Sequence, residues 1–462
     1  MYLSEYLSGI LSNFNDSRTI RNVKNVCSKI IEHKSIQLWS ISDDKAEFER
    51  SKRLIDGSLI SVLDDKKISD ALREHGTGCL GNENRVIVLY DPCDIRKAHS
   101  EKLENLGTVR SLDGELINGY STFNSVGINE QGKKIYPIDI SVYSNGDGHY
   151  VKGKELKRFS KGKLQDSDKQ EDRKRAQEIQ EYLEEDSDVN MRHIAFEQMR
   201  RVSKDFKKIN PDVTICKVLD RQFDGDDYFL FIDETLEDEF VIRMKISRNS
   251  NEFEINPETG KKEYIKLKDV KLATKEIFYI DKLSIKKKVY QQVKLVIEYD
   301  KLTIKEKDFT VVRVTLLDRT GKMIFDNPML LITNIPVKSK DQARAVYRTY
   351  LMRSKIEGVF KFLKSVLGWE QFQIEDYESI KNIIALCYFI GAYFYEIESE
   401  LTNNQTIQAI CLLGAGKGKV TRYFFLQGLK KILVHKSVKR FVKKQNITHE
   451  IWEDMLRFVD LN

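Results

Sequence analysis

Closely spaced cysteines are missing from this sequence. The six cysteines are Cys27, Cys79, Cys93, Cys216, Cys387 and Cys411, and no two of them form a Cys-x-x-Cys pair. Because zinc modules and disulfide frameworks draw on cysteines at short or regular spacings, this scatter argues against both. Thiols that stay unpaired fit a reducing compartment, so we expect a cytoplasmic protein.

Long apolar runs are missing as well. The longest, residues 383–395, has 13 residues and includes Gly391. A membrane-spanning helix needs about 20 apolar residues, so this run predicts a buried helix instead. The first residues, MYLSEYLSGILSNF, have no basic region ahead of an apolar one and do not resemble a signal peptide. We therefore expect no contact with a membrane.

The sequence has little net charge, but its charges are unevenly distributed. Lysine and arginine number 77 against 71 aspartates and glutamates, a net charge of +6 that does not by itself imply a nucleic-acid partner. Residues 401–449, however, contain no acidic residue. The basic residues of this segment are Lys417, Lys419, Arg422, Lys430, Lys431, Lys436, Lys439, Arg440, Lys443 and Lys444. Such a segment with interleaved aromatic residues indicates nucleic-acid binding, although a basic tail that only aids solubility has the same composition.

The size and composition are those of a globular protein with more than one domain. With 462 residues and 41% hydrophobic side chains, the chain can bury a sizeable core and divides into roughly two to four domains. Residues 1–80 alternate helical patterns with polar breaks and predict a small helical domain. Its second helix carries Arg18, Arg21, Lys24 and Lys29, which could contact DNA phosphates or form a solvated helix face.

Residues 346–367 are the most informative stretch of the sequence. Read as one helix, they place Tyr350, Arg353, Glu357 and Lys364 within an arc of roughly 60°, beside an apolar face that would seat the helix on a core. A carboxylate flanked by a guanidinium, a phenol and an ammonium is suited to binding phosphate and metal. A surface helix with an Arg353–Glu357 ion pair one turn apart would have the same pattern.

Two apolar runs upstream of this stretch each end on an aspartate. Residues 85–90 precede Asp91, and residues 213–219 precede Asp220. A carboxylate that directly follows a buried strand projects from the end of a sheet, where a metal can bind. Asp-Pro after a strand is also ordinary turn chemistry, so Asp91 could have that role alone.

Three further aspartates could replace Asp220 in this role. Asp224, Asp226 and Asp227 follow it closely. They fall in the opening turn of the next predicted helix, where aspartate is a natural capping residue. We therefore favour Asp220 as the second carboxylate.

The rest of the sequence predicts a series of strands and one exposed excursion between them. Strands are predicted at residues 119–128 and 134–143, and residues 151–188 carry so many charges of both signs that they predict an exposed excursion ahead of a covering helix. The long interval between Asp220 and Glu357 contains alternating runs that predict further strands, namely FVIRMKI, EYIKLKDVKL, EIFYIDKLSI, VYQQVKLVIEY and FTVVRVTLLD. A last core strand is predicted at residues 329–333.

The spacing Tyr350-x2-Arg353-x3-Glu357-x6-Lys364 resembles the Tyr-Arg-Glu-Lys signature of a family of bacterial insertion-sequence DDE transposases, the insertion-sequence family four type within the ribonuclease H-like, retroviral integrase superfamily. The resemblance implies that Asp91, Asp220 and Glu357 hold two Mg²⁺ ions, for which Mn²⁺ could substitute, and that they form the catalytic site. It also implies that Tyr350, Arg353 and Lys364 hold DNA phosphates.

The same resemblance implies a function. The protein would cleave the ends of an insertion sequence and join them to target DNA, with double-stranded DNA (terminal inverted repeats and target) as its partner. It would act as a homodimer in the DNA complex, in the bacterial cytoplasm at the nucleoid. From the basic segment we add Lys439, Arg440, Lys443 and Lys444 as DNA-binding residues. The alternatives are a ribonuclease H-like nuclease that cuts without strand transfer and a catalytically inactive DNA-binding derivative.

The expected fold class is α/β, a ribonuclease H-like mixed sheet core with an inserted strand-rich subdomain. The expected domains are a helical DNA-binding domain at 1–80, the first part of the catalytic core at 81–245, the β-rich insertion at 246–327, the remainder of the core with the signature helix at 328–400, and a helical basic C-terminal region at 401–462.

Overall fold

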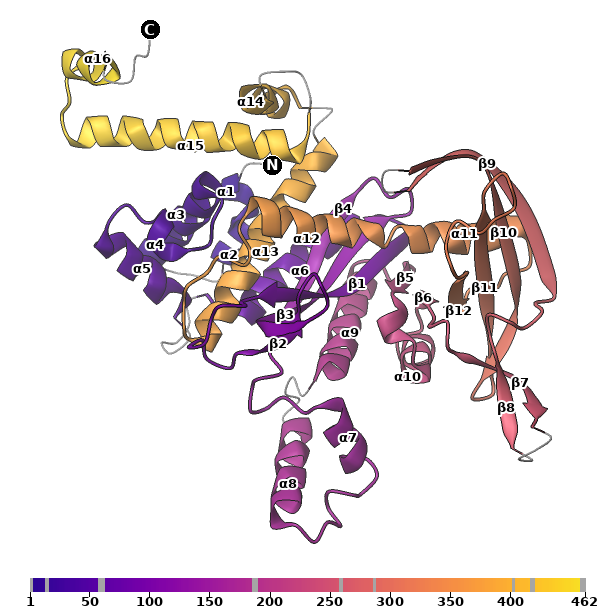
Figure 1. The fold of residues 1–462 in the computed structure, drawn as a ribbon. Coiled ribbons are helices and arrows are strands. Elements are labelled where there is room, and N and C mark those ends of the chain that lie inside the picture. Colours follow the sequence, from indigo (N-terminus) through magenta and orange to yellow (C-terminus); the bar gives the residue numbers. More distant parts are fainter. Residues whose placement is uncertain are drawn as a thin grey trace.

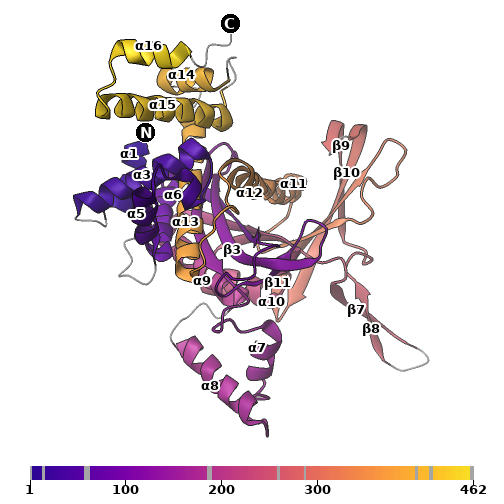
Figure 2. The same cartoon turned by 60° about the vertical axis from the view of Figure 1, so that its left-hand side comes forward.

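A mixed β-sheet with helices on both faces forms the body of the protein (Figures 1 and 2). The computed structural model describes residues 3–12, 16–56, 63–184, 190–256, 261–285, 288–400, 404–415 and 420–457. The strands are β1 (Arg85–Arg96), β2 (Gly107–Arg110), β3 (Leu116–Asn129), β4 (Ile135–Tyr143), β5 (Thr214–Leu219), β6 (Glu239–Arg243), β7 (Asn249–Ile255), β8 (Lys262–Lys266), β9 (Thr274–Ile285), β10 (Lys288–Ile304), β11 (Lys307–Leu317) and β12 (Met329–Thr333).

Helices precede, interrupt and follow this sheet along the chain. They are α1 (Leu3–Tyr6), α2 (Ser8–Leu11), α3 (Ser17–His33), α4 (Leu38–Ile41), α5 (Lys45–Ile55), α6 (Asp65–Leu80), α7 (Gly153–Phe159), α8 (Gln170–Glu184), α9 (Met191–Ile209), α10 (Asp226–Leu230), α11 (Lys340–Leu351), α12 (Ser354–Val366), α13 (Tyr377–Glu400), α14 (Gln405–Ala415), α15 (Arg422–Lys444) and α16 (His449–Arg457). A 3₁₀ turn, η1 (Arg221–Phe223), follows β5, and a π-helical turn, η2 (Phe231–Thr235), continues α10.

The strand order identifies the core of the sheet. In the order β4-β3-β1-β5-β6, β3 runs antiparallel to β4 and β1, whereas β5 and β6 run parallel to β1. The helical segment that ends in α9 connects β4 to β5. This order, with its second strand reversed, is the ribonuclease H-like arrangement, so the expected α/β fold class is confirmed.

Strand β1 is longer than its sequence indicated. It continues through Asp91 and Pro92 to Arg96, so the expectation that Asp91 comes after the strand is wrong. β5 pairs with β1 as far as Leu89, and beyond this point β1 is paired with β3. Pro92 lacks an N–H group but is tolerated here because one edge of the strand is open. Asp91 therefore lies within β1 but past the end of the β1–β5 ladder.

The strand-rich insertion extends the core sheet. The first strand expected between Asp220 and Glu357, at residues 240–246, is β6 of the core, which pairs in parallel with β5 and antiparallel with β12. From β12 the sheet continues antiparallel through β11, β10 and β9, at the right of Figure 1. The remaining strands, β7 and β8, form a separate two-stranded sheet. The final core strand was predicted at 329–333 and is confirmed as β12.

The stretch at residues 346–367 forms two helices, α11 and α12, so the expectation of one helix is wrong. Between them the N–H groups of Met352 and Arg353 donate to the carbonyls of Thr349 and Tyr350 at 3.2 and 3.0 Å. Bonds between residues three apart make a tighter turn than the α-helix and change the angular spacing along the axis. Tyr350 consequently lies on α11, and Arg353 directly precedes α12.

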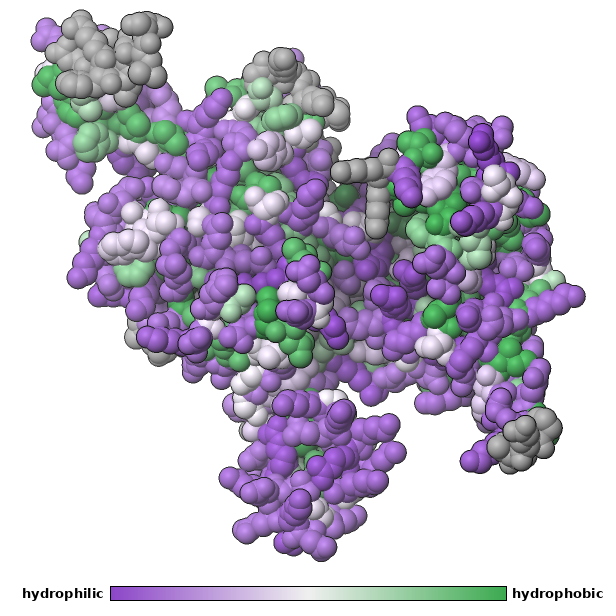
Figure 3. Space-filling view, in the orientation of Figure 1, coloured by the Kyte–Doolittle hydropathy of each residue, from purple (hydrophilic) through white to green (hydrophobic). Residues whose placement is uncertain are grey.

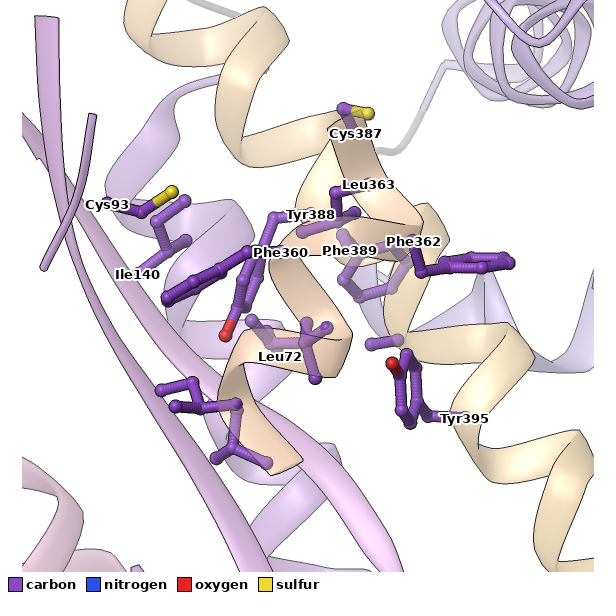
Figure 4. Close-up of a cluster of buried hydrophobic side chains, with 14 of the residues drawn as sticks. Leu72, Cys93, Ile140, Phe360, Phe362, Leu363, Cys387, Tyr388, Phe389 and Tyr395 are labelled. Atoms are coloured by element: carbon purple, nitrogen blue, oxygen red, sulfur yellow. The ribbon is translucent and has the colours of Figure 1, made fainter. Parts of the chain in front are cut away.

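Helix α13 is the buried helix that the apolar run at residues 383–395 predicted. Its composition and length would allow it to cross a membrane, but 94% of its apolar window is buried inside the protein, as in a core helix. Figure 4 shows Phe360 and Leu363 of α12 beside Tyr388 and Phe389 of α13, over the sheet. Since each large apolar side chain stabilises by about 1.5–3 kcal/mol when fully buried, this layer fixes α12 against the core.

A polar lobe and the two chain ends complete the fold. Helices α7 and α8 project from the body and have a largely hydrophilic surface (Figures 1 and 3), which confirms the expected excursion before α9. The Asp16 carboxylate caps α3, and Arg18, Arg21 and Lys24 of this helix are exposed. Lys29 is 8% exposed.

The expectation that Lys29 belongs to the basic surface of α3 is therefore wrong. Its position on the helix turns it inward, where its ammonium lies 2.5 Å from the Asp43 carboxylate.

Helix α6 lies within the expected N-terminal domain, yet it packs against β4 and α13. At the other end of the chain, α15 packs against α3 and α14, and Lys417 and Lys419 lie outside the described residues.

Candidate active site

Two of the expected carboxylates are placed by the register of neighbouring strands. The parallel β1–β5 ladder ends at the pair Leu89 and Val218. Asp91 and Asp220 each lie two residues beyond this pair, and residues two apart on a strand point to the same face. Parallel strands are about 4.8 Å apart, so the register places the two carboxylates side by side.

The third carboxylate comes from α12, and Arg353 connects it to the other two. Nη1 of Arg353 donates to Glu357 Oε1 at 2.9 Å and to Asp91 Oδ2 at 3.4 Å, while Nη2 donates to Asp220 Oδ2 at 3.4 Å. Because Asp91 and Glu357 share one nitrogen, their contacting oxygens can be no farther apart than the sum of two hydrogen-bond lengths. Side chains that the sequence separates by 266 residues (357 minus 91) thus meet at one point.

Burial and mutual repulsion perturb the charges at this site. Burial raises the pKa of Asp91 to about 7; Asp220 and Glu357 add to the rise and the Arg353 guanidinium opposes it. Burial alone would lower the pKa of Arg353, but the neighbouring carboxylates and Tyr350 raise it. With the Arg353 guanidinium already in place, the site still favours one further positive charge, which a proton on Asp91 supplies.

The three carboxylates fit the requirements of a site for hard divalent cations. Mg²⁺ and Mn²⁺ prefer oxygen ligands, and all three candidate ligands supply them. Arg353 already holds a positive charge between the three groups, in the manner of a stand-in cation. Glu357 has the most exposed side chain of the three, at 61%. A cation could therefore approach from its side.

The competing aspartates have other partners. Asp224 accepts hydrogen bonds from the Arg248 guanidinium at 2.7 Å and from the Lys245 backbone at 2.9 Å. Asp226 also pairs with Arg248, and Asp227 pairs with Arg192. These carboxylates fix the loop after β5, whereas Asp220 faces Arg353.

Tyr350 and Lys364, the other two signature residues, have structural partners. Tyr350 is 6% exposed, burial raises the pKa of its phenol, and its hydroxyl is hydrogen-bonded to Arg243 on β6. The Lys364 ammonium lies 2.9 Å from Glu370 Oε1 and also donates to the Asp94 carbonyl. These contacts hold α11 and α12 against the sheet beside the carboxylates.

Sequence reasoning missed Arg243 as a residue of the site. An arginine in the otherwise apolar run at residues 240–244 was the available signal. Arg243, Arg221, Lys245 and Asp220 line one open hollow of about 590 Å³. Three cationic side chains give this hollow a charge complementary to a phosphodiester backbone, and Asp220 adds a candidate metal ligand to it.

The four basic residues expected to bind DNA lie far along the chain, on α15. Lys439, Arg440, Lys443 and Lys444 are all exposed on this helix. Their exposure leaves them available to phosphates. Their contact with DNA stays a prediction.

Comparisons with known proteins show likeness at the level of structure but not of sequence. No protein-family model matches the chain, and no curated protein is similar to it in sequence. Among solved structures, the synaptic complex of piggyBac transposase with hairpin DNA resembles it over 97% of this chain and 80% of the other, with 11% sequence identity and a TM-score of 0.39. A likeness of this degree does not assign a family, so what the chain does is argued from its own residues.

Proposed function

We propose that this protein is a DDE transposase, which cleaves the ends of an insertion sequence and joins them to target DNA at one active site. One observation carries the proposal. Asp91, Asp220 and Glu357 come from three elements and meet on the Arg353 guanidinium, where the parallel β1–β5 ladder of a ribonuclease H-like sheet ends. Ligand sites of open parallel sheets lie at these strand ends.

The three carboxylates are the groups that would hold two Mg²⁺ ions, or Mn²⁺ in their place. When bound, such ions supply an activated water or 3′-hydroxyl nucleophile and neutralise charge on the phosphate. Asp91, whose pKa burial raises to about 7, would lose its proton when the ions bind.

Arg353 would exchange its carboxylate partners for a DNA phosphate. A guanidinium can bind phosphate through two parallel hydrogen bonds, which fixes orientation as well as position. Tyr350 on α11 and Lys364 on α12 would support this contact with phosphate, and Arg243 on β6 would add another contact.

Basic surfaces at both chain ends would hold the double-stranded DNA. Exposed Arg18, Arg21 and Lys24 lie on α3, and the basic helix α15 packs against α3. DNA binding that neutralises phosphates at these positions would be strongly salt-dependent. Cutting two terminal repeats requires two active sites, so we propose that the protein works as a homodimer on DNA, in the cytoplasm at the nucleoid.

A paired experiment on Glu357 tests the proposal. Glu357→Gln keeps the size of the side chain and removes the charge that would hold a cation, while Arg353 remains available for phosphate. On labelled DNA from the ends that flank the gene, the variant should bind as the parent does but lose Mg²⁺-dependent nicking and joining by roughly a thousandfold or more. Mobility shift and nicking are measured on the same DNA.

Glu378→Gln serves as the matched control. This glutamate is also exposed, lies on α13 and pairs with Lys381, so its replacement should leave nicking unchanged. Near-normal nicking by Glu357→Gln would reduce Glu357 to a structural partner of Arg353 and refute the mechanism. Nicking without joining in the parent would identify a nuclease, and binding without either would identify an inactive DNA-binding derivative.

A further inference from the structure

We propose that His75 and Cys79 of α6 and Glu396 of α13 form a Zn²⁺ site that joins these two helices. Their spacing on α6 is the first support. His75 and Cys79 are four residues apart, so they lie on the same face of the helix about one turn from each other. Glu396, 321 residues after His75 in the chain, reaches the same place from α13.

The ligand atoms already converge. The Nε2 atom of His75 lies 2.6 Å from Glu396 Oε2 and 3.6 Å from Cys79 Sγ. One ligand atom from each residue lies within 4.8 Å of the others. A nitrogen, a sulfur and an oxygen atom from three side chains therefore meet at one place, whereas an ordinary ion pair needs only two side chains.

The distances can be compared with those of a tetrahedral zinc site. Zinc bonds of about 2.1 Å to nitrogen or oxygen and about 2.3 Å to sulfur place neighbouring ligand atoms about 3.4–3.6 Å apart. The His75–Cys79 separation of 3.6 Å matches that spacing. The His75–Glu396 separation of 2.6 Å is a hydrogen bond and must lengthen by less than about 1 Å. Glutamate has three rotatable side-chain torsions, so a movement of this size needs no change in the backbone.

The donor set selects the metal. A thiolate, an imidazole and a carboxylate suit zinc, whereas Mg²⁺ prefers oxygen ligands alone. Three protein ligands leave the fourth tetrahedral position for water, and the His75 side chain, 29% exposed, gives the site access to solvent. The ring of Tyr6 packs edge-on against His75 with centroids 5.0 Å apart, which restrains the imidazole.

The proposed site is separate from the DNA-cleaving carboxylates. Its ligands come from α6 and α13, whereas Asp91, Asp220 and Glu357 come from β1, the end of β5, and α12. The scattered cysteines argued against zinc because they include no Cys-x-x-Cys pair. A site with a single cysteine needs no such pair, so cysteine spacing could not reveal it. Its role would be structural: an ion that binds the folded chain and not the unfolded one stabilises the packing of α6 on α13.

Cobalt substitution in the full-length protein provides the test. Co²⁺ bound to a thiolate has a charge-transfer band that oxygen-only sites lack. We expect one such band per chain, its loss in Cys79→Ser, at least a tenfold weaker affinity in Glu396→Gln, and displacement by Zn²⁺. The band should persist in Asp91→Asn, which alters the carboxylate site, and in Cys411→Ser, which alters a cysteine on α14.

A second measurement covers the case in which Cys79→Ser fails to fold. Zn²⁺ should raise the melting temperature of the parent above its value in EDTA, and this shift should shrink in Glu396→Gln. Absence of a thiolate band in the parent would overturn the proposal. So would a band that survives in folded Cys79→Ser, or a zinc-dependent shift of equal size in the parent and Glu396→Gln.

Discussion

Replacement of Asp91 by asparagine should stabilise the metal-free protein in alkaline buffer. The Asp91 side chain is 14% exposed, and burial with two neighbouring carboxylates raises its pKa from 3.8 to about 7. Because the pKa is raised on folding, the folded state binds a proton that the unfolded state has released between these two values. Stability therefore falls as the pH rises through this window.

The size of the effect follows from the pKa change. A rise of about 3 units corresponds to about 4 kcal/mol at 1.36 kcal/mol per unit, fully expressed above the folded-state pKa. Asparagine has no charge to bury, so Asp91→Asn should be more stable than the parent by up to about 4 kcal/mol at pH 8. At pH 5 the difference should be less than half of this, since Asp91 is then protonated in the folded parent.

Denaturant unfolding in EDTA at both pH values measures this difference. Asp94→Asn is the matched control on the same strand, because the Asp94 carboxylate bonds to the Arg110 backbone instead of Arg353. A second series with Mg²⁺ should stabilise the parent and not Asp91→Asn. A variant that is less stable than the parent at pH 8, or a stability difference that does not change with pH, would refute the electrostatic reasoning.

Three further predictions follow from the same structure. Arg353→Gln removes the cation that competes for the three carboxylates and should tighten Mg²⁺ binding about tenfold by calorimetry; unchanged affinity would show that Arg353 does not occupy the cation position. Asp238→Ala leaves Lys217, 0% exposed and 3.2 Å from the carboxylate, buried without its anionic partner and should cost about 3–5 kcal/mol in denaturant unfolding. The exposed Asp308→Ala is its control and should change stability by less than about 0.5 kcal/mol. Replacing Lys439, Arg440, Lys443 and Lys444 together should weaken DNA binding and reduce its salt slope by roughly one per lost phosphate contact, and an unreduced slope would remove α15 from the DNA-binding surface.

Much of the core could be predicted from the sequence because its strands are locally distinctive. Strands buried on both faces appear as apolar runs, so β1, β3, β4 and β5 were all located. The ends of these strands were predicted less accurately than their positions. Pro92 indicated that β1 stops at Asp91, but a strand with one open edge accepts proline and continues. β2 and β7 were missed because each is short or exposed and carries a weak apolar pattern.

The local sequence determined which side chains had the chemistry for a site. A carboxylate past a buried run marked Asp91 and Asp220, and helical spacing marked Arg353 and Glu357. The resemblance to a transposase signature joined these two observations into one hypothesis. None of these signals states how far apart the groups lie in space.

Only the tertiary structure decided how these side chains meet. The parallel register of β1 and β5 sets Asp91 beside Asp220, and the tight turn before α12 directs Arg353 to all three carboxylates. Packing of α6 against α13 likewise brings His75 and Cys79 to Glu396. The physical reason is that residue type and periodicity are local properties, whereas strand register and helix packing are set by contacts between segments hundreds of residues apart.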